Sequence, residues 1–441
     1  MKENPHKKST NYHRRIGWCA WLTAAIFYLY EYFIRVAPSV MEGHLRQTFH
    51  VNATTLGFAT GLYYMVYGPM QIVVGPLFDR FGARKLFFLA VCSVSFGCFF
   101  ASIPASHISM FALGRLFMGF GSAFAFIGTV YVATMWFPPS KLAFLSGMTT
   151  ALGMFGAILG QTPIAKIVNW LNWRNAWVLA GGLGILCALS VYRWLPSGPQ
   201  ESSCLRNGAD GARQSMPPFL KILWTITKNP QTWIIGAVAC FLFFPLIVFA
   251  DFWGIRYIEL ATGADKSHAA MANGMLYLGW LLGSPIAGAL SDHLRHRRRF
   301  FTISCLIGTI LLLCILIPSH FSIASIALLL FLLGLVSSPQ VICFIASVEL
   351  NPSHLKATAM AMINTIVMLF GGMAQPLCGF FMDLQQRFSP IFYGEYTLRQ
   401  YRMALMILPM AMFAGFILSF FIRESFGRHH LPEDGKDVVC E

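Results

Sequence analysis

The stretch Gly75-Pro-Leu-Phe-Asp79-Arg80-Phe-Gly82-Ala-Arg84-Lys85 is a short charged segment that separates two long apolar runs. A charged segment cannot enter lipid, so it marks a point at which the chain turns at a membrane surface. A second segment with the same order of glycine, acidic and basic residues follows in the other half of the chain, with its matching positions at Gly288, Asp292 and Arg297. This repeat predicts two similar membrane-embedded halves.

The composition is that of a chain embedded in lipid. Charged residues make up 11% and hydrophobic residues 56% of the 441 residues, whereas soluble domains carry roughly 25% charged residues. The net charge of +14 lies mainly in short loops between apolar runs, and not on a wet face with interleaved aromatics as in nucleic-acid-binding proteins. We therefore expect a lipid bilayer around the protein and no nucleic-acid partner.

Apolar runs long enough to span a bilayer, roughly 17–25 residues each, recur along the chain. They predict an all-α membrane protein with twelve transmembrane helices in two pseudo-symmetric six-helix halves. In the first half we expect helices near residues 16–40, 53–77, 86–104, 108–136, 142–167 and 174–195. In the second half we expect them near residues 231–258, 267–290, 300–318, 320–349, 356–381 and 402–423.

Most Lys and Arg residues fall in loops on one side of these helices, which identifies that side as cytoplasmic. We expect a bacterial inner-membrane protein with both termini in the cytoplasm. Proline and glycine in the centre of the chain indicate a linker, with a surface helix at 219–228. The expected parts are an N-terminal tail at 1–15, the two halves at 16–195 and 230–423, a linker at 196–229 and a C-terminal tail at 424–441.

The segment 75–85 resembles the loop between helices 2 and 3 of the major facilitator superfamily, and its match to that motif is nearly complete. Gly114-Arg115 and Asn172-Trp173-Arg174 are similar to further features of the family, so the resemblance covers essentially the whole chain. It implies a rocker-switch carrier with one central cavity that opens alternately to each side. It also implies a gating role for Gly75, Asp79, Arg80, Gly82, Arg84, Lys85, Gly288, Asp292 and Arg297.

Five charged side chains within the predicted helices are our candidates for a solute or proton pathway, because charge inside a membrane is costly and marks such a pathway by default. They are Glu31, Arg35, Arg115, Asp251 and Arg256. We expect the arginines to bind an anionic group of the solute, because arginine stays charged and grips carboxylate or phosphate with two hydrogen bonds. We expect Glu31 and Asp251 to exchange protons. The structural alternative is that Glu31 pairs with Arg35 or Arg115 and fastens helices together.

Gln161 and Gln375 are polar residues at matching positions of the two halves. We assign them to solute binding, with hydrogen bonds to neighbouring helices as the alternative. Tyr63, Tyr64 and Tyr67 could line the cavity or serve packing. The sequence contains no nucleotide-binding loop and no His or Cys cluster with metal-ligand spacing, so we expect no cofactor, no metal and no enzymatic activity.

These features predict secondary active transport of a small polar solute by alternating access. The stretch Tyr30–Arg35 resembles helix 1 of organic-anion and organophosphate carriers, and the same stretch continued to Met41 resembles a family of lysosomal dipeptide carriers. We therefore expect proton-coupled uptake of an organic anion, an amino acid or a dipeptide, by a chain that functions as a monomer. Two alternatives stay open: a drug or siderophore exporter of the same superfamily, and a nontransporting membrane receptor on the same scaffold.

Overall fold

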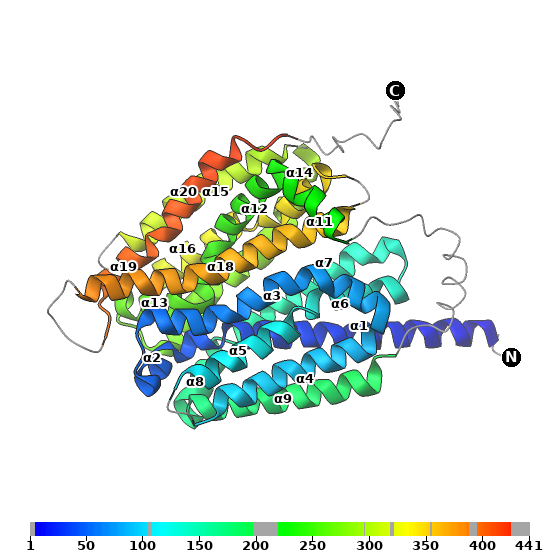
Figure 1. The fold of residues 1–441 in the computed structure, drawn as a ribbon, viewed down its shortest axis with the longest axis horizontal. Helices are drawn as coiled ribbons and strands as arrows, with labels where there is room; N and C mark the ends of the chain where they lie inside the picture. Colours follow the sequence, from blue (N-terminus) through cyan, green and yellow to red (C-terminus); the bar gives the residue numbers. More distant parts are fainter. Residues whose placement is uncertain are drawn as a thin grey trace.

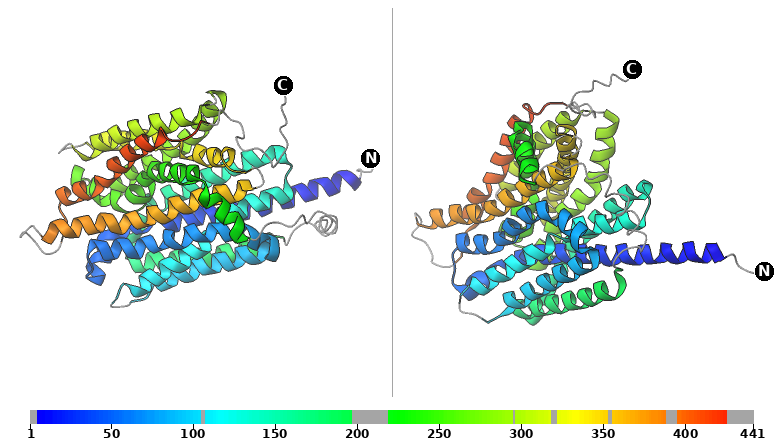
Figure 2. Two further views of the ribbon diagram at one scale, coloured as in Figure 1. Left: turned by 45° about the horizontal axis from the view of Figure 1, so that its top comes forward. Right: turned by 45° about the vertical axis from the view of Figure 1, so that its right-hand side comes forward.

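The chain folds into two bundles of long helices that lie side by side in the computed structural model (Figure 1). The structure describes residues 5–104, 107–196, 219–294, 296–317, 322–352, 355–387 and 395–424. The helices α1 to α9 form one bundle and the helices α11 to α20 form the other. Two further views show the same division of the chain into an N-terminal and a C-terminal half (Figure 2).

The membrane helices of both halves are continuous or divided in two by a short break. In the N-terminal half they are α1 (Pro5–Val36) with α2 (Pro38–Phe49), α3 (Ala53–Phe81), α4 (Ala83–Ser102), α5 (Ser109–Ser122) with α6 (Ala125–Trp136), α7 (Pro139–Leu159) with α8 (Thr162–Leu171), and α9 (Trp173–Trp194). In the C-terminal half α11 (Phe219–Lys228) precedes α12 (Pro230–Phe244), the π-helix η1 (Pro245–Trp253) and α13 (Gly254–Thr262). They are followed by α14 (Lys266–Leu294), α15 (Arg297–Leu316), α16 (Ile323–Ser337) with α17 (Gln340–Glu349), α18 (Lys356–Arg387), and α19 (Leu398–Leu405) with α20 (Ile407–Ser419).

The predicted all-α fold with six membrane helices in each half is confirmed. Ten of the described helical segments are long and apolar enough to cross a membrane. The helices α1 and α3, with 32 and 29 residues, complete the arrangement. The helix α3 carries tyrosines, and α1 carries charged side chains, that meet at the centre of the molecule.

Helix boundaries depart from the expected ranges at the start of the chain. The helix α1 begins at Pro5, inside the segment expected as a tail, and a new helix starts at Pro38 because proline has no N–H to continue the hydrogen-bond ladder. The helix α11 has the bounds expected for the surface helix. The linker residues 197–218 and the tail residues 425–441 lie outside the described residues.

The two ends of the bundles differ in what they carry. One end holds the start of α1, the turn at Gly82 between α3 and α4, and the end of α20, and we call it the basic end. The other end holds α2, α13 and α19, and we call it the α2 end. The helix α3 therefore runs from the α2 end at Ala53 to the basic end at Phe81.

The helices α3 and α18 touch backbone to backbone and join the two halves. A Cβ added at Gly57 would lie 2.8 Å from the carbonyl oxygen of Gln375, and one added at Gly61 would lie 2.5 Å from that of Gly372. Glycine is needed at such positions because small residues allow membrane helices to approach closely. This interface places α3 between the two halves.

Hydrogen bonds between the halves close the α2 end. Asp383, near the end of α18, accepts from the backbone N–H groups of Ala53 at 3.1 Å and Thr54 at 2.9 Å, which start α3. Toward the basic end, the cross-half hydrogen bonds of the described residues reach no further than Gly68, whose carbonyl oxygen accepts from Thr365 Oγ1 at 2.9 Å. The halves are therefore joined at the α2 end and the centre.

Candidate substrate and proton site

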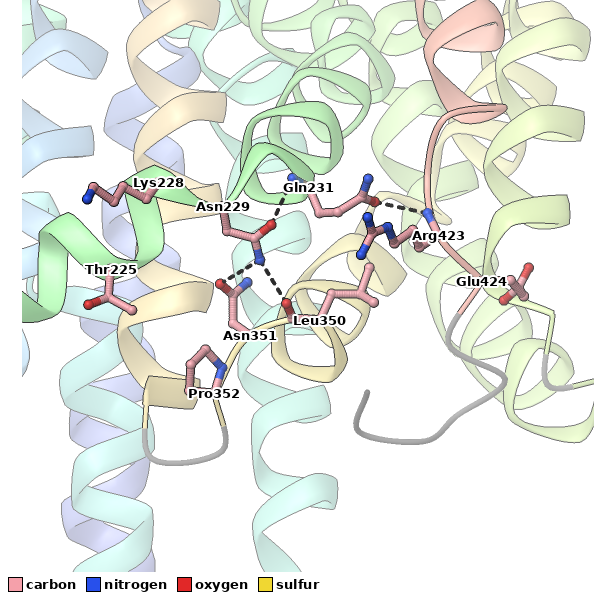
Figure 3. A pocket seen from close by; sticks show the side chains of 9 residues that line it. All are labelled: Thr225, Lys228, Asn229, Gln231, Leu350, Asn351, Pro352, Arg423 and Glu424. Atoms are coloured by element: carbon pink, nitrogen blue, oxygen red, sulfur yellow. Dashed lines mark hydrogen bonds between the residues drawn. The ribbon is translucent and has the colours of Figure 1, made fainter. Parts of the chain in front are cut away.

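A polar pocket lies at the basic end of the C-terminal half (Figure 3). Its side chains bind the ends of nearby helices: Asn229 Nδ2 donates to the carbonyl oxygen of Leu350 at 2.8 Å, and Gln231 Oε1 accepts from the backbone N–H of Arg423 at 2.9 Å. At ~1.5 Å per residue, the helix that starts at the pocket carries Asp251 roughly 30 Å away. We attribute this pocket to the joint between helix ends and look for the solute site at the centre.

Four of the five predicted charged residues come together at the centre of the molecule. Glu31 and Arg35 lie on α1, Arg115 on α5 and Asp251 on η1, and none is more than 3% exposed. Each carboxylate interacts electrostatically with at least one of the arginines. Because buried charges are costly unless they are paired or hydrogen-bonded, the partners of each residue decide what it can do.

Glu31 and Arg35 form an ion pair one helical turn apart. Nε and Nη2 of Arg35 donate to Oε1 of Glu31 at 2.9 and 2.6 Å. The hydroxyl of Tyr63 donates to the same oxygen. The second carboxylate oxygen, Oε2, has no hydrogen-bond partner among the described residues. The pair anticipated from the sequence is therefore present, and one oxygen of Glu31 is left for a proton or a solute donor.

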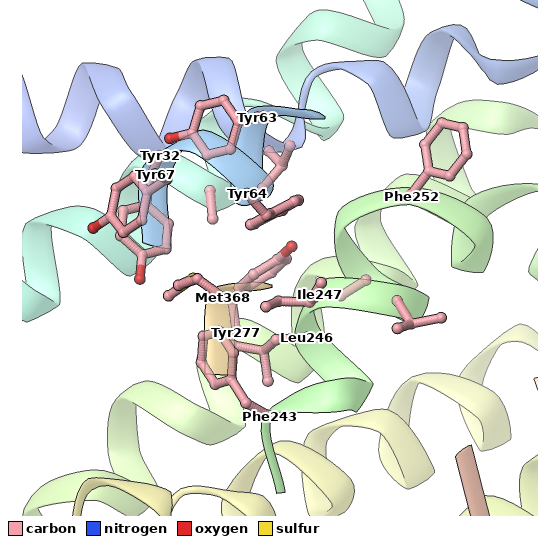
Figure 4. Close-up of a cluster of buried hydrophobic side chains, with 14 of the residues drawn as sticks. Tyr32, Tyr63, Tyr64, Tyr67, Phe243, Leu246, Ile247, Phe252, Tyr277 and Met368 are labelled. Atoms are coloured by element: carbon pink, nitrogen blue, oxygen red, sulfur yellow. The ribbon is translucent and has the colours of Figure 1, made fainter. Parts of the chain in front are cut away.

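Four tyrosine rings surround the guanidinium of Arg35. Its Cζ lies 4.1 Å from the ring centroid of Tyr32 and 5.1 Å from that of Tyr67. The rings of Tyr63 and Tyr64 lie at 5.8 and 5.9 Å. Figure 4 shows Tyr64 between the blue helices of the N-terminal half and the green and orange helices of the C-terminal half. Cation–π contacts of this kind stabilise a buried guanidinium, so Arg35 is held by both a carboxylate and aromatic faces.

Arg115 forms no ion pair with a carboxylate of the described residues. Its guanidinium donates to the carbonyl oxygens of Thr60 and Ile34 at 3.3 Å, and its Cζ lies 4.5 Å from the ring centroid of Tyr63. The bond to Ile34 fastens α5 to α1 through the backbone and not through Glu31. Carbonyl oxygens satisfy the N–H groups but carry no full charge, so the charge of Arg115 has no directly bonded counterion.

Both carboxylate oxygens of Asp251 accept tyrosine hydroxyls. Tyr64 of α3 donates to Oδ2, and Tyr277 of α14 donates to Oδ1. Tyr64 belongs to the N-terminal half and Tyr277 to the C-terminal half. The charged carboxylate is thus satisfied by two neutral donors, and it joins the two halves at the centre of the molecule.

Asp251 is carried by the π-helix η1, which continues directly into Gly254. A π-helical segment holds an extra residue within a helix and is frequent at functional sites. The sequence contains this extra residue, since the acid-to-arginine spacing is five in Asp251–Arg256 but four in Glu31–Arg35. The extra residue is therefore accommodated by a change of helix type that begins before Gly254.

Side-chain amides bind the carbonyl oxygens of η1. Gln375 Nε2 donates to Ile247 at 2.8 Å, while Gln161 Nε2 and Asn273 Nδ2 both donate to Ala250 at 2.8 Å. The three amide oxygens are buried and have no hydrogen-bond partner among the described residues. The glutamines therefore contact a neighbouring helix, as the structural alternative expected, and still present oxygens to a solute that carries N–H or O–H groups.

Arg256 does not join the central cluster. Its side chain is 28% exposed and forms ion pairs with Glu259 and Glu395, each at 3.0 Å. Both acids, Glu259 on the same helix and Glu395 before α19, lie away from the central cluster, and they hold the guanidinium of Arg256 there. The structure brings together Arg35 and Arg115 at the centre, and it holds Arg256 between two acids nearer the α2 end.

The two charged segments are bound within their own halves. Arg84 Nη2 donates to the carbonyl oxygen of Tyr192 at 2.5 Å, and Arg297 Nη2 donates to Glu349 Oε1 at 3.1 Å. Gly82 has a φ of 78°, which glycine adopts without strain, and it ends α3. Among the residues predicted for gating, Arg80 and Lys85 are exposed. A Cβ added at Gly75 or Gly288 would meet no atom within 4 Å.

The acidic side chains of the two segments, those of Asp79 and Asp292, lie outside the part of the chain that the structure describes. The gating role of both segments therefore stays a prediction.

Asn273 and Tyr277 belong to the site although no motif marks them in the sequence. They are four residues apart on α14, so they share one face of that helix. That face contacts consecutive residues of η1, because Asn273 binds Ala250 and Tyr277 binds Asp251. A polar pair at helical spacing within an apolar run is the signal that could have found them.

Two repeated bundles of membrane helices with buried charges between them define the architecture of a secondary transporter. The chain belongs to the Major Facilitator Superfamily, whose family model matches residues 20–376. It is a membrane transporter and not an enzyme.

Known relatives and structures agree with this family. The uncharacterized transporter YybO of Bacillus subtilis is 24% identical over 402 residues, which cover 85% of this chain and 90% of the relative. The probable sulfoacetate transporter SauU of Cupriavidus necator is 23% identical over 62% of this chain and 64% of the relative. A bacterial homologue of the human lysosomal transporter Spinster shares the fold, with a TM-score of 0.73 and 17% identity over 94% of this chain and 98% of that chain.

Proposed function

We propose that the protein takes up a small organic anion together with a proton, by alternating access, as a monomer. The proposal places it in the inner membrane of a bacterium, with the basic end and both termini in the cytoplasm, as the distribution of Lys and Arg favours. The α2 end then faces outward, and the cross-half contacts of Asp383 close the outward side of the carrier.

The surroundings of Arg115 are the observation that supports an anionic solute. Arg115 is 1% exposed, and its contacts to carbonyl oxygens are long, at 3.3 to 3.5 Å. A carboxylate or sulfonate at this position would replace them with short charge-assisted hydrogen bonds, which are roughly twice as strong as neutral ones. Arg35 differs because Glu31 already occupies two of its N–H groups.

The balance of buried charge supports coupling to a proton. Glu31 and Asp251 are each one negative charge, and Arg35 and Arg115 are each one positive charge, so the empty site is neutral when all four are ionised. A bound monovalent anion adds an uncompensated charge, which is costly in a low-dielectric interior. Protonation of Glu31 or Asp251 restores neutrality, so anion and proton favour each other's binding. A zwitterionic amino acid or dipeptide needs no such proton.

The similarity to a probable sulfoacetate transporter, SauU, points in the same direction, because sulfoacetate is a small organic anion. The buried amide oxygens of Gln161, Asn273 and Gln375 suit a solute that also carries hydrogen-bond donors. We therefore favour small carboxylates and sulfonates with hydroxyl groups.

Uptake into proteoliposomes tests this proposal. Radiolabelled carboxylates, sulfonates, sugar acids, amino acids and dipeptides are offered with and without an acid-outside pH gradient. We expect one class of anion to accumulate with the gradient, and Arg115→Gln to reduce its uptake on the order of a hundredfold, as for a lost hydrogen-bonded charge contact. Arg256→Gln, which lies outside the cluster, should retain uptake.

Two results would contradict the proposal. One is that Arg115→Gln, shown to be folded by thermal unfolding, transports the anion like the wild type. The other is that a zwitterion accumulates and the pH gradient has no effect on it.

A further inference from the structure

Two adjacent residues of α3 bind the two buried acids of opposite halves. Tyr63 donates to Glu31 of the N-terminal half, and Tyr64 donates to Asp251 of the C-terminal half. Both tyrosines are fully buried. Successive residues on an α-helix point about 100° apart, so this turn of α3 faces α1 with one ring and η1 with the next. One turn of a single interface helix therefore contacts both candidate proton acceptors.

The two hydrogen bonds of Asp251 differ in what they join. The bond from Tyr277 stays within the C-terminal half, where Asn273, on the same face of α14, also holds η1 through Ala250 at 2.8 Å. The bond from Tyr64 crosses between the halves. Movement of one half against the other can therefore break the Tyr64 bond, while the Tyr277 bond moves with the acid.

Protonation of Asp251 changes this arrangement. A charged carboxylate only accepts hydrogen bonds, whereas a protonated one carries its own O–H donor. When a proton from solvent binds at Oδ2, that oxygen no longer accepts the Tyr64 hydroxyl as before. The charge-assisted bond across the halves is then replaced by a weaker one between neutral groups, and the two halves are held less tightly at the centre.

We propose that Tyr64 is a positioning residue that couples the protonation of Asp251 to the opening of the α2 end, an inference that rests on the proposed proton-coupled uptake. With the α2 end closed, two hydroxyl donors favour the charged form of Asp251, so the proton leaves toward the basic end. With the α2 end open, one donor is gone and the carboxyl group takes a proton from the outward side. The same bond thus couples the protonation of Asp251 to which end of the carrier is open, while the proton gradient sets the direction of net movement.

The other charged groups near Asp251 stay in place when the hydrogen bond from Tyr64 is removed. Arg35 on α1 and Arg115 on α5 act on the carboxylate from the N-terminal half, and Asp251 in turn acts on Glu31. Tyr277 is the remaining direct partner. Because removal of either tyrosine hydroxyl leaves all three charges in place, Tyr64→Phe and Tyr277→Phe form a matched pair that differs in whether the lost bond crosses the halves.

The test measures the distance between the halves at the α2 end. Spin labels are attached at Gln47→Cys on α2 and Arg399→Cys on α19, two exposed positions, in a full-length, cysteine-depleted protein in lipid nanodiscs. Electron–electron double resonance then gives the ratio of long to short distances between pH 5 and 8. In the wild type we expect short distances at high pH and a growing long-distance population as the pH falls.

At high pH, Tyr64→Phe should raise the ratio of long to short distances on the order of tenfold, the effect of one hydrogen bond to a charged group, and should flatten its pH dependence. Tyr277→Phe should stay closed at high pH and keep its pH dependence. Asp251→Asn, which cannot ionise, should hold one ratio at every pH. Thermal unfolding of each variant checks that it is folded.

Equal distance distributions for Tyr64→Phe and Tyr277→Phe would overturn the inference, as would an unchanged pH dependence in Asp251→Asn. Neither result depends on a solute, because the measurement uses the empty carrier. Failure to find a transported anion would count against the proposed function alone.

Discussion

At the residue scale, the central charges fall into two kinds. Arg35 and Glu31 neutralise each other within one turn of α1, and both are at most 1% exposed. Arg115 and Asp251 instead bind only neutral partners directly, carbonyl oxygens for one and tyrosine hydroxyls for the other. We infer that the first pair maintains the structure around the site, while the second two residues respond to what enters it.

Removal of one member of the pair should therefore destabilise the protein. Arg35→Gln leaves the charge of Glu31 buried without its partner, which costs about 3–5 kcal/mol for a buried ion pair. The double variant Glu31→Gln/Arg35→Gln removes both charges and should recover much of that loss. Thermal unfolding in detergent at pH 7 measures both variants. A double variant as unstable as Arg35→Gln would show that the loss comes from packing and not from the unpaired charge.

At the scale of elements, α3 and η1 carry the specialised features of the molecule. The helix α3 combines glycines that touch α18 with the tyrosines that contact both acids. The π-helix η1 presents carbonyl oxygens to three side-chain amides and places Asp251 between two tyrosines. Both elements lie where the two halves meet, so small changes in their geometry act on both halves.

The close contact of α3 with α18 should be sensitive to a single methyl group. Gly61→Ala would place a Cβ 2.5 Å from the carbonyl oxygen of Gly372, which forces the helices apart at a cost of about 1–3 kcal/mol. Gly147→Ala on α7 meets no atom within 4 Å and serves as the control, since alanine in an open helical position is favourable by roughly 0.5–1 kcal/mol. Melting temperatures and uptake rates of the two variants provide the comparison. Equal stability would show that the interface can relax.

At the scale of the whole molecule, one acidic residue at the α2 end caps a helix of the other half, beside the hydroxyl of Tyr396, which also accepts from Ala53 at 3.0 Å. Asp383 accepts from the first two N–H groups of α3, while Asn52 caps the same helix from within its own half by accepting from Thr55 at 2.9 Å. Backbone N–H groups at the start of a helix have no acceptor inside the helix. Asp383 supplies this acceptor across the interface only while the α2 end is closed.

Asp383→Ala should therefore open the α2 end more often. We expect hydrogen exchange at the amides of Ala53 and Thr54 to become faster on the order of tenfold, as for the loss of a hydrogen bond to a charged group. Asn52→Ala should speed exchange at Thr55 and leave the other two amides protected. Mass spectrometry with residue-level fragmentation distinguishes the two patterns. Unchanged exchange at Ala53 and Thr54 in Asp383→Ala would mean that other contacts keep this end closed.

The sequence by itself determined the class of fold and its internal repeat. Length and apolarity of the runs define membrane helices because lipid offers no hydrogen bonds to an unfolded backbone, and the charged segments at 75–85 and 288–298 mark the matching turns. The Glu31–Arg35 pair could also be predicted from the sequence, since residues four apart share a helix face. These features depend on neighbours in the chain and on the solvent around it.

Only the tertiary structure decided which of the buried groups act together. The hydroxyls that bind Asp251 belong to Tyr64 and Tyr277. The guanidinium of Arg115 is bound by carbonyl oxygens of α1 and α3, and no spacing in the sequence relates these to Arg115. Arg256 was predicted with the same argument as Arg35, yet its ion pairs with Glu259 and Glu395 hold it away from the centre. The physical reason is that hydrogen bonds and ion pairs act over a few ångströms, and such distances between remote segments are set by how the two halves pack.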